Sequence, residues 1–264
     1  MFLITSIFSP LPPSLFIKTM CVVNVVTMAN IGYSEIKGKH LKYSKFWNFN
    51  SDKSSNNKEI KLSAKTGMLF LYTPSFLAGL ASFWLFPHEG FRFMLLTSAL
   101  TVHFFKRIVE VLFIHKYSSG MVLDSAIVIS LSYLISTAAM IYVQSEGLGE
   151  PTIDLKFLGM ILFLLGISGN FYHHYLLSKM RRNGEKEYKI PTSGLFDKVV
   201  CPHYLFEILG FWGIFFIAQT LYAFCYAIGV TFYLMGRSYA TRAWYLSKFE
   251  DFPKHVKSIF PYIF

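Results

Sequence analysis

Seven apolar blocks, each long enough to cross a bilayer, constrain the fold of this chain more than any other feature. They lie near residues 14–33, 67–86, 91–114, 121–143, 155–178, 203–218 and 219–236. About 20 consecutive apolar residues cross the hydrocarbon core as one α-helix. The sequence therefore predicts an all-α, polytopic membrane helical bundle with about seven transmembrane helices. The last two blocks are also compatible with one long stretch folded as a tight hairpin.

The composition agrees with helices that face lipid. Of the 264 residues, 53% are hydrophobic and 18% are aromatic, whereas soluble domains are about 45–50% apolar. Aromatic side chains are enriched where helices meet the membrane interface. The three cysteines, Cys21, Cys201 and Cys225, form no C-x-x-C pair. Their odd number predicts reduced thiols and no disulfide framework.

The loops between the blocks alternate in charge. Segment 37–65 contains eight lysines, and segments 179–198 and 237–257 are also basic. Loop 144–154 contains Glu146, Glu150 and Asp154 and neither Lys nor Arg. Because basic loops stay in the cytosol, we expect the N-terminus outside the cytosol and the C-terminus inside it. The net charge of +10 is then a topology signal, and we expect no nucleic-acid partner.

Ionisable side chains inside the blocks are costly and tend to mark function. They form three groups, each on one helical face: His103, Lys106, Arg107 and Glu110; Asn170, His173 and His174; His203 and Glu207. The first group is either an internal ion pair that joins helices, or a substrate- or cofactor-facing cation held by its glutamate. The paired histidines are either interfacial or functional. Pro202 fits the first turn of a helix, which places the third group at a helix start.

The sequence lacks the common nucleotide-binding and histidine-box motifs. The sequence has no G-x-G-x-x-G motif and no P-loop, so a nucleotide must bind in a helical pocket. Cations for its phosphates stand at Arg181, Arg182, Lys186, Lys189, Arg237 and Arg242. Positive-inside bias explains these charges equally well. The eight histidines are scattered and form no histidine box, so we expect no metal site.

The last third of the chain carries a longer pattern. It reads Gly184-Glu185-Lys186-Glu187-Tyr188-Lys189-Ile190-Pro191, then Gly194-Leu195-Phe196, then Pro202-His203-Tyr204 with Glu207. It closes with Tyr245-Leu246 and Lys248-Phe249-Glu250-Asp251-Phe252-Pro253. This pattern resembles the C-terminal domain of the steroid 5α-reductase (3-oxo-5-alpha-steroid 4-dehydrogenase) family, most closely its plant members. The resemblance divides the chain into an N-terminal membrane region, 1–154, on the substrate side, and an NADPH-binding C-terminal domain, 155–264.

The resemblance also implies an activity. Family members are seven-helix proteins of the endoplasmic reticulum that use NADPH to reduce a double bond conjugated to a carbonyl group. It implies cofactor contacts by Asn170, Arg181, Tyr188, Lys189, His203, Glu207, Arg237 and Tyr245. Two of the positions differ from the family pattern: Lys189 replaces an arginine, and His174 replaces the aspartate of the animal steroid enzymes.

The substrate end departs further from the steroid enzymes. They hold the 3-ketone with a glutamate and a tyrosine, and the matching positions here are Tyr72 and Phe104. The third block also resembles the very-long-chain trans-2-enoyl-CoA reductases, whose lysine and tyrosine match Lys106 and Tyr204. We therefore expect Tyr72, Lys106, Tyr204 and Glu207 to be catalytic, the last one by orienting the nicotinamide.

Several functions remain open on this basis. The first is an NADPH-dependent reductase of a lipid, most similar to 3-oxo-5-alpha-steroid 4-dehydrogenase. The alternatives within the family are a trans-2-enoyl-CoA reductase of fatty acid elongation and a polyprenol reductase. Outside it, an isoprenylcysteine methyltransferase-like enzyme would use S-adenosylmethionine, although Lys248-Phe249-Glu250-Asp251 does not match its C-terminal pattern. An inactive scaffold is the third possibility.

Overall fold

The computed structural model describes residues 6–10, 14–40, 60–117, 120–147, 149–180 and 189–264. Its described residues form seven α-helices: α2 (Leu15–Ile36), α4 (Ala64–Leu85), α5 (Phe91–Val109), α6 (Leu123–Ser145), α7 (Lys156–Lys179), α8 (Pro202–Ala218) and α9 (Leu221–Lys248). Each predicted apolar block corresponds to one of them. The predicted all-α membrane bundle is therefore confirmed.

Helix α9 is longer than the apolar block from which it was predicted. The block ends near residue 236, whereas the helix continues to Lys248. The extension is polar in sequence, and it stays helical because Arg237, Thr241 and Tyr245 remain on its buried face. Of the described helices, α2, α4 and α6 are long and apolar enough to cross a membrane by length and composition. The total of seven crossings stays a prediction.

Several helix starts are set by their first residues. The hydroxyl groups of Ser14, Ser63 and Thr220 accept hydrogen bonds from backbone amides of the first turns of α2, α4 and α9. Such caps satisfy amides that have no partner within the helix. Pro202 occupies the first turn of α8, as predicted. The chain turns between α8 and α9 at Gln219, which has a positive φ of 50°. The last two apolar blocks therefore form two separate helices joined by a tight turn.

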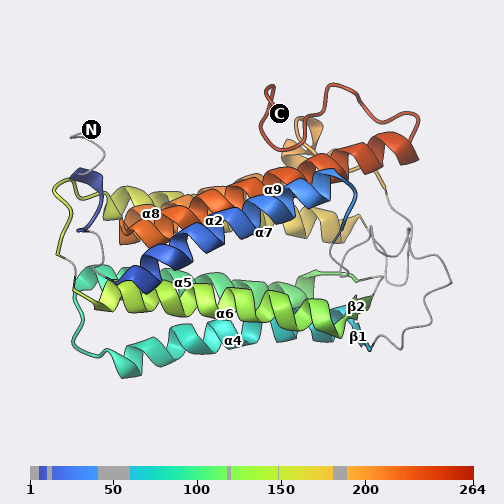
Figure 1. Cartoon of the computed structure of the whole chain (residues 1–264). Coiled ribbons are helices and arrows are strands. Elements are labelled where there is room, and N and C mark those ends of the chain that lie inside the picture. Colours follow the sequence, from blue (N-terminus) through green and yellow to red (C-terminus); the bar gives the residue numbers. More distant parts are fainter. Residues whose placement is uncertain (1–5, 11–13, 41–59, 118–119, 148, 181–188) are drawn as a thin grey trace.

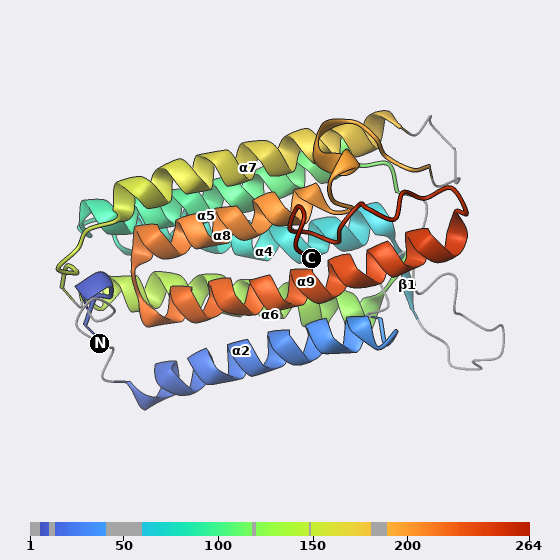
Figure 2. The same ribbon diagram turned by 90° about the horizontal axis from the view of Figure 1, so that it is seen from above.

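The helices alternate in direction and form two layers (Figure 1). One layer contains α2, α7, α8 and α9, and the other contains α4, α5 and α6. The C-terminal ends of α2, α5, α7 and α9 lie at one end of the bundle, together with β1 (Lys61–Ser63) and β2 (Gly120–Val122) (Figures 1 and 2). The largest apolar core cluster joins residues on both sides of position 154.

The sequence analysis predicted neither the pair of short strands nor the π-helical turn of this bundle. Strands β1 and β2 pair antiparallel, with Leu62 opposite Met121. Helix α5 continues into a π-helical turn, η1 (Glu110–Ile114). Single π-helical turns inside helices often occur at functional sites, and this one begins at a completely buried glutamate.

Candidate active site

A cavity of about 690 Å³ lies within the bundle and is lined by residues of all seven described α-helices, α2 and α4 to α9. This volume is within the range of small-molecule and cofactor sites, about 300–1,000 Å³. Most of its wall is apolar. Seven of the predicted site residues line it: Tyr72, Lys189, His203, Tyr204, Glu207, Arg237 and Tyr245. They come from four separate stretches of the chain.

The start of α8 presents three of these side chains to the cavity. His203, Tyr204 and Glu207 all line it. Asn170 of α7 fixes this turn, because its amide donates to the carbonyl oxygen of His203 at 2.7 Å and to Glu207 Oε2 at 3.4 Å. Asn170 is buried and holds the cavity residues from behind.

Lys106 lies behind the wall as well. Its ammonium group contacts Glu110 Oε1 at 2.7 Å and also hydrogen-bonds to Asn170 Oδ1. Lys106 thus connects α5 with α7 and, through Asn170, with α8. It is not among the residues that line the cavity, so a substrate would meet it only after a rearrangement of these contacts.

Glu110 is the centre of an ion-pair cluster. Its carboxylate is fully buried and contacts Lys106, Arg107 Nη1 at 3.1 Å and His174 Nδ1 at 2.9 Å. A carboxylate at this depth requires such partners, because an unpaired buried charge is strongly unfavourable. The sequence analysis offered two interpretations of this polar face, an ion pair that joins helices and a cation that faces the site. The cluster does both, because it joins α5 to α7 and fixes Arg107, which lines the cavity.

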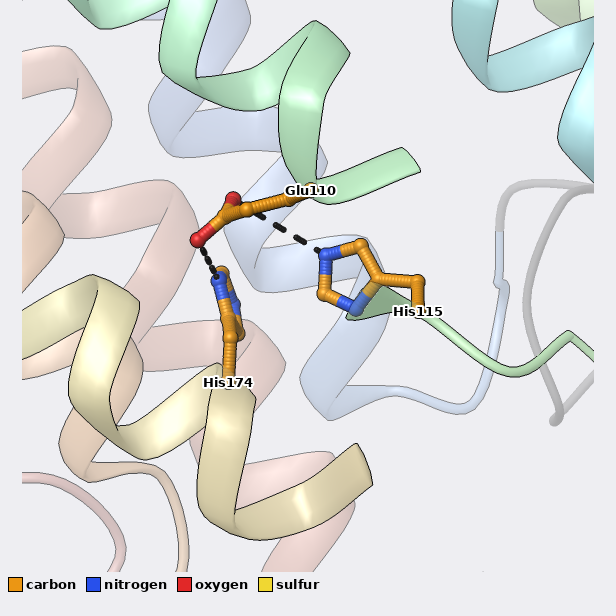
Figure 3. Close-up of side chains that lie close together, drawn as sticks. All are labelled: Glu110, His115 and His174. Atoms are coloured by element: carbon orange, nitrogen blue, oxygen red, sulfur yellow. Dashed lines mark hydrogen bonds and ion pairs between the residues drawn. The ribbon is translucent and has the colours of Figure 1, made fainter. Parts of the chain in front are cut away.

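Glu110, His115 and His174 also place one ligand atom each within 4.8 Å of the others (Figure 3). His115 Nε2 lies 3.9 Å from Glu110 Oε2. Burial and then the charge of Arg107 lower the pKa of His115 to about 4, so its ring is neutral at neutral pH. A metal ion on this carboxylate would meet two cations, Lys106 and Arg107, at ion-pair distance. These residues fit an ion-pair network and do not fit a metal ion.

Arg107 also reaches Tyr72 on α4. Its Nη2 donates to the Tyr72 hydroxyl oxygen at 2.7 Å, and its guanidinium lies over the Tyr72 ring, 4.9 Å from the centroid. Arg107 was not among the predicted site residues. The sequence pattern that could have indicated Arg107 is its place between Lys106 and Glu110 on one polar helical face. This pattern does not show which helix the side chain contacts.

Arg237 is held by an acid that the sequence analysis missed. Its Nη1 lies 2.9 Å from Glu35 Oε1 on α2, and Glu35 Oε2 lies 2.6 Å from His40 Nδ1. Both partners of the pair are buried. The signal for Glu35 was an acidic residue near the end of an apolar block. Arg237 lines the cavity while it is paired in this way.

The remaining predicted residues differ in where they lie relative to the cavity. Tyr245 lines the cavity and is stacked on Phe249 and Phe252, with ring centroids at 5.8 and 5.3 Å. The His173 ring does not join the cluster of His174. Its Nδ1 contacts the Gly169 carbonyl oxygen at 2.7 Å, and its Nε2 accepts a hydrogen bond from the backbone amide of Leu195 at 3.3 Å. Arg181 and Tyr188 lie outside the described residues.

Phe104 of α5, which the sequence analysis matched to a ketone-binding tyrosine, is 1% exposed and packs in the apolar cluster that also contains Tyr72. Tyr133 of α6 contacts both rings, with centroids 5.7 Å from Phe104 and 5.8 Å from Tyr72. The hydroxyl of Tyr72 is thus presented from α4, across a layer of aromatic side chains.

Comparison with known proteins gives a consistent result. The family model described as 3-oxo-5-alpha-steroid 4-dehydrogenase matches residues 127–264, just over half of the 264 residues. A very-long-chain enoyl-CoA reductase of Dictyostelium discoideum is 31% identical over 175 residues, which are 62% of this chain and 55% of that protein.

Two steroid enzymes are also similar. The 3-oxo-5-alpha-steroid 4-dehydrogenase 2 of Homo sapiens is 37% identical over 112 residues, 42% of this chain and 44% of that protein. The steroid 5-alpha-reductase DET2 of Gossypium hirsutum is 36% identical over 107 residues, 40% of this chain and 42% of that protein. The matched part of the chain thus spans about half the length of these curated relatives.

Proposed function

The chain belongs to the 3-oxo-5-alpha-steroid 4-dehydrogenase family, and from this premise we propose that it uses NADPH to reduce a carbon–carbon double bond conjugated to a carbonyl group in a lipid. A steroid with a 4-ene-3-one group is the first candidate substrate. The observation that carries the proposal is a cavity in which an apolar wall meets hydroxyl, carboxylate and cationic side chains. We also propose the endoplasmic reticulum membrane as its location, with the C-terminus in the cytosol.

Cofactor binding and substrate binding are assigned to different parts of the chain in this proposal. Residues 155–264 would bind the cofactor, and residues 1–154 would hold the lipid. The family model matches residues 127–264, which include the whole C-terminal part and most of α6. The cavity-lining cations Lys189 and Arg237 come from the C-terminal part, whereas Tyr72 comes from the N-terminal part.

The residues present fit a phosphorylated dinucleotide. Lys189 and Arg237, with Arg181, would bind its phosphates, because guanidinium and ammonium groups are the usual partners of phosphate oxygens. Tyr188 and Tyr245 would contact its rings. Glu207, with His203, would hold the carboxamide, and Asn170 would support them from behind the wall, where it orients this turn of α8. When bound, NADPH supplies the hydride of the reaction.

The polar side chains around the cavity would act on the substrate. The carbonyl oxygen gains negative charge as the β-carbon is reduced, and a preorganised donor for such an oxygen typically contributes about 3–4 kcal/mol. Tyr72, Tyr204 and Lys106 are the candidate donors, and Glu207 would orient the reacting groups. Tyr72 and Tyr204 line the cavity directly, whereas Lys106 supports it through Glu110 and Asn170.

Reduction of a trans-2-enoyl-CoA is the second candidate activity. The Dictyostelium discoideum enoyl-CoA reductase matches 62% of this chain, more than the steroid enzymes named above. The polar face of the third span also follows the enoyl-CoA reductase pattern. The apolar wall of the cavity accommodates either an acyl chain or a steroid skeleton.

The proposal is tested by NADPH consumption. Purified protein in detergent is given, in parallel, a 4-ene-3-one steroid, a long trans-2-enoyl-CoA and a polyprenol. We expect NADPH oxidation with one of them and a product two hydrogens heavier. NADPH, but not S-adenosylmethionine, should also raise the unfolding temperature, because a ligand of the native state stabilises it by mass action. Stabilisation by S-adenosylmethionine alone would refute the reductase.

A further inference from the structure

Tyr72 and Arg107 form a donor pair at the cavity wall. Both residues line the cavity. The guanidinium donates to the phenol oxygen at 2.7 Å and also covers the ring, with 4.9 Å between Arg107 Cζ and the centroid. The two side chains come from α4 and α5, 35 residues apart. The pair therefore exists only because these helices pack side by side.

The orientation of Arg107 is fixed from its other side. Its Nη1 lies 3.1 Å from Glu110 Oε2 and 3.4 Å from His174 Nδ1. Glu110 is itself held by Lys106 at 2.7 Å. A guanidinium between a buried carboxylate and a phenol has little freedom to rotate, since its planar fork fixes the directions of its donors.

This arrangement determines what the phenol can do. Arginine has no acceptor, so the Tyr72 oxygen must be the acceptor of this hydrogen bond. A hydroxyl group that accepts from a cation donates its own hydrogen more strongly, because hydrogen bonds in a chain polarise one another. On the donating side, the Tyr72 hydroxyl contacts the Met68 sulfur at 4.0 Å, a weak acceptor that a carbonyl oxygen can displace.

We propose that Tyr72 is the catalytic donor to the substrate carbonyl, and that Arg107 is a positioning residue that orients and polarises its hydroxyl group. This inference rests on the proposed function. It selects Tyr72 over Lys106, because Lys106 is engaged behind the wall by Glu110 and Asn170. It favours Tyr72 over Tyr204 because the Tyr72 hydroxyl accepts a hydrogen bond from a fixed cation at the cavity wall.

The chemistry balances with one hydride and one proton. The hydride carries two electrons to the β-carbon, and the electron pair of the double bond moves toward the carbonyl oxygen. Tyr72 stabilises that oxygen by a hydrogen bond and keeps its proton. A proton from water then adds to the α-carbon, and the carbonyl double bond forms again.

A double-mutant cycle tests the pair on the steroid or the enoyl-CoA, whichever is reduced, because these two substrates carry the conjugated carbonyl group. Tyr72→Phe should lower kcat about 100- to 1,000-fold with little change in KM, as expected for a donor that acts in the transition state. Arg107→Gln should lower kcat about 10- to 100-fold, the range of one charge-assisted hydrogen bond. In the Tyr72→Phe background, Arg107→Gln should cost less than about threefold, because its effect passes through the phenol.

The controls separate this role from a purely structural one. Tyr172→Phe removes the hydroxyl of a tyrosine on α7 that is 50% exposed and lies outside the cavity wall, and kcat should stay unchanged. Arg107→Lys should recover part of the activity, since an ammonium group also donates to the phenol. NADPH binding, measured by fluorescence quenching, should change by less than threefold in every variant.

Three outcomes would overturn the inference. Wild-type kcat in Tyr72→Phe excludes the donor, and this variant decides the question even if Arg107→Gln does not fold. Multiplicative losses in the double variant mean that Arg107 contacts the substrate independently. If the wild-type protein reduces none of the three substrates, the proposed function fails and the donor assignment fails with it.

Discussion

Gln219 shows how much a single side chain organises at the end of the bundle opposite the strands. It is completely buried at a positive φ of 50°. Its Oε1 accepts from Arg92 and from the amide of Leu155, and its Nε2 donates to the carbonyl oxygens of Ile7 and Ile153. All four hydrogen bonds of an amide side chain are therefore made, and they tie the α8–α9 turn to the N-terminal segment, the start of α5 and the segment before α7.

The same network contains an acidic pair outside the membrane spans. Buried Arg92 contacts Glu150 at 2.6 Å and Asp154 at 2.7 Å. Burial raises the pKa of Asp154, but hydrogen bonds from Lys156 and Arg92 outweigh it and hold the pKa at about 2. The ordinary value is 3.8, so the folded protein binds this proton less readily than the unfolded chain.

Asp154 should make stability depend on acid pH. A carboxylate with a lowered pKa in the folded state stabilises fully above pH 4, and this contribution is lost as pH falls from about 4 to about 2. In detergent, the wild-type unfolding temperature should fall more between pH 5 and pH 3 than that of Asp154→Asn. At pH 7 the variant should be the less stable of the two. Equal pH slopes for both proteins would contradict the assignment, and Glu89→Gln, in the turn between α4 and α5, is the control.

At the scale of the element, glycine determines how closely α7 and α8 approach. A Cβ atom built on Gly166 would overlap the backbone of Gly210 and lie 2.8 Å from the Phe206 carbonyl oxygen. A Cβ atom on Gly210 would meet only the Gly166 Cα atom, at 4.0 Å, which is an ordinary contact. Small residues let membrane helices pack closely, and close packing is what holds such helices together.

Two alanine substitutions in this interface should therefore have opposite effects. Gly166→Ala forces the backbones apart, and overpacking of this kind typically costs about 1–3 kcal/mol. Gly210→Ala introduces no clash and gains up to about 1 kcal/mol in helix propensity. Thermal unfolding in detergent should show a lower midpoint for the first variant and an equal or higher one for the second. If both variants shift alike, backbone contact does not govern this interface.

At the scale of the whole molecule, helix direction brings the polar groups to one end of the cavity. Because successive helices alternate in direction (Figure 1), the C-terminal halves of α5, α7 and α9 lie beside the start of α8. These segments carry His174, Arg237 and His203, and Glu110 follows directly after α5 in η1. The C-terminal ends of α2, α7 and α9 lie at this end (Figure 1), and we expect it to face the cytosol because basic segments follow them in the sequence.

Cysteine labelling tests this orientation. Single cysteines replace exposed Lys254, in the C-terminal segment, and exposed Glu146, after α6, in a background with Cys225→Ser. In intact microsomes, a membrane-impermeant maleimide should label Lys254→Cys but label Glu146→Cys only after detergent is added, because the two positions lie on opposite sides. The native Cys21 and Cys201 are buried and serve as the unlabelled background. The reversed pattern would show the opposite topology.

Part of the site was predictable because it lies on single helices. His203 and Glu207 are four residues apart, and both line the cavity with Tyr204, as one helical face requires. Asn170 and His174 share a face in the same way, but His173 was grouped with them and instead contacts the segment at Leu195. Periodicity assigns a face to each helix and does not identify the helix opposite.

The class of fold, the approximate position of each helix and the family could be predicted from the sequence, because lipid burial and the C-terminal motif are properties of contiguous residues. The pairing of buried polar groups could not be predicted: Arg107 meets Tyr72 across 35 residues, and Arg237 meets Glu35 across 202. A buried charge must find a partner, since leaving it unpaired is strongly unfavourable. Which partner it finds depends on helix packing, and packing is decided by contacts between segments that are far apart in the chain.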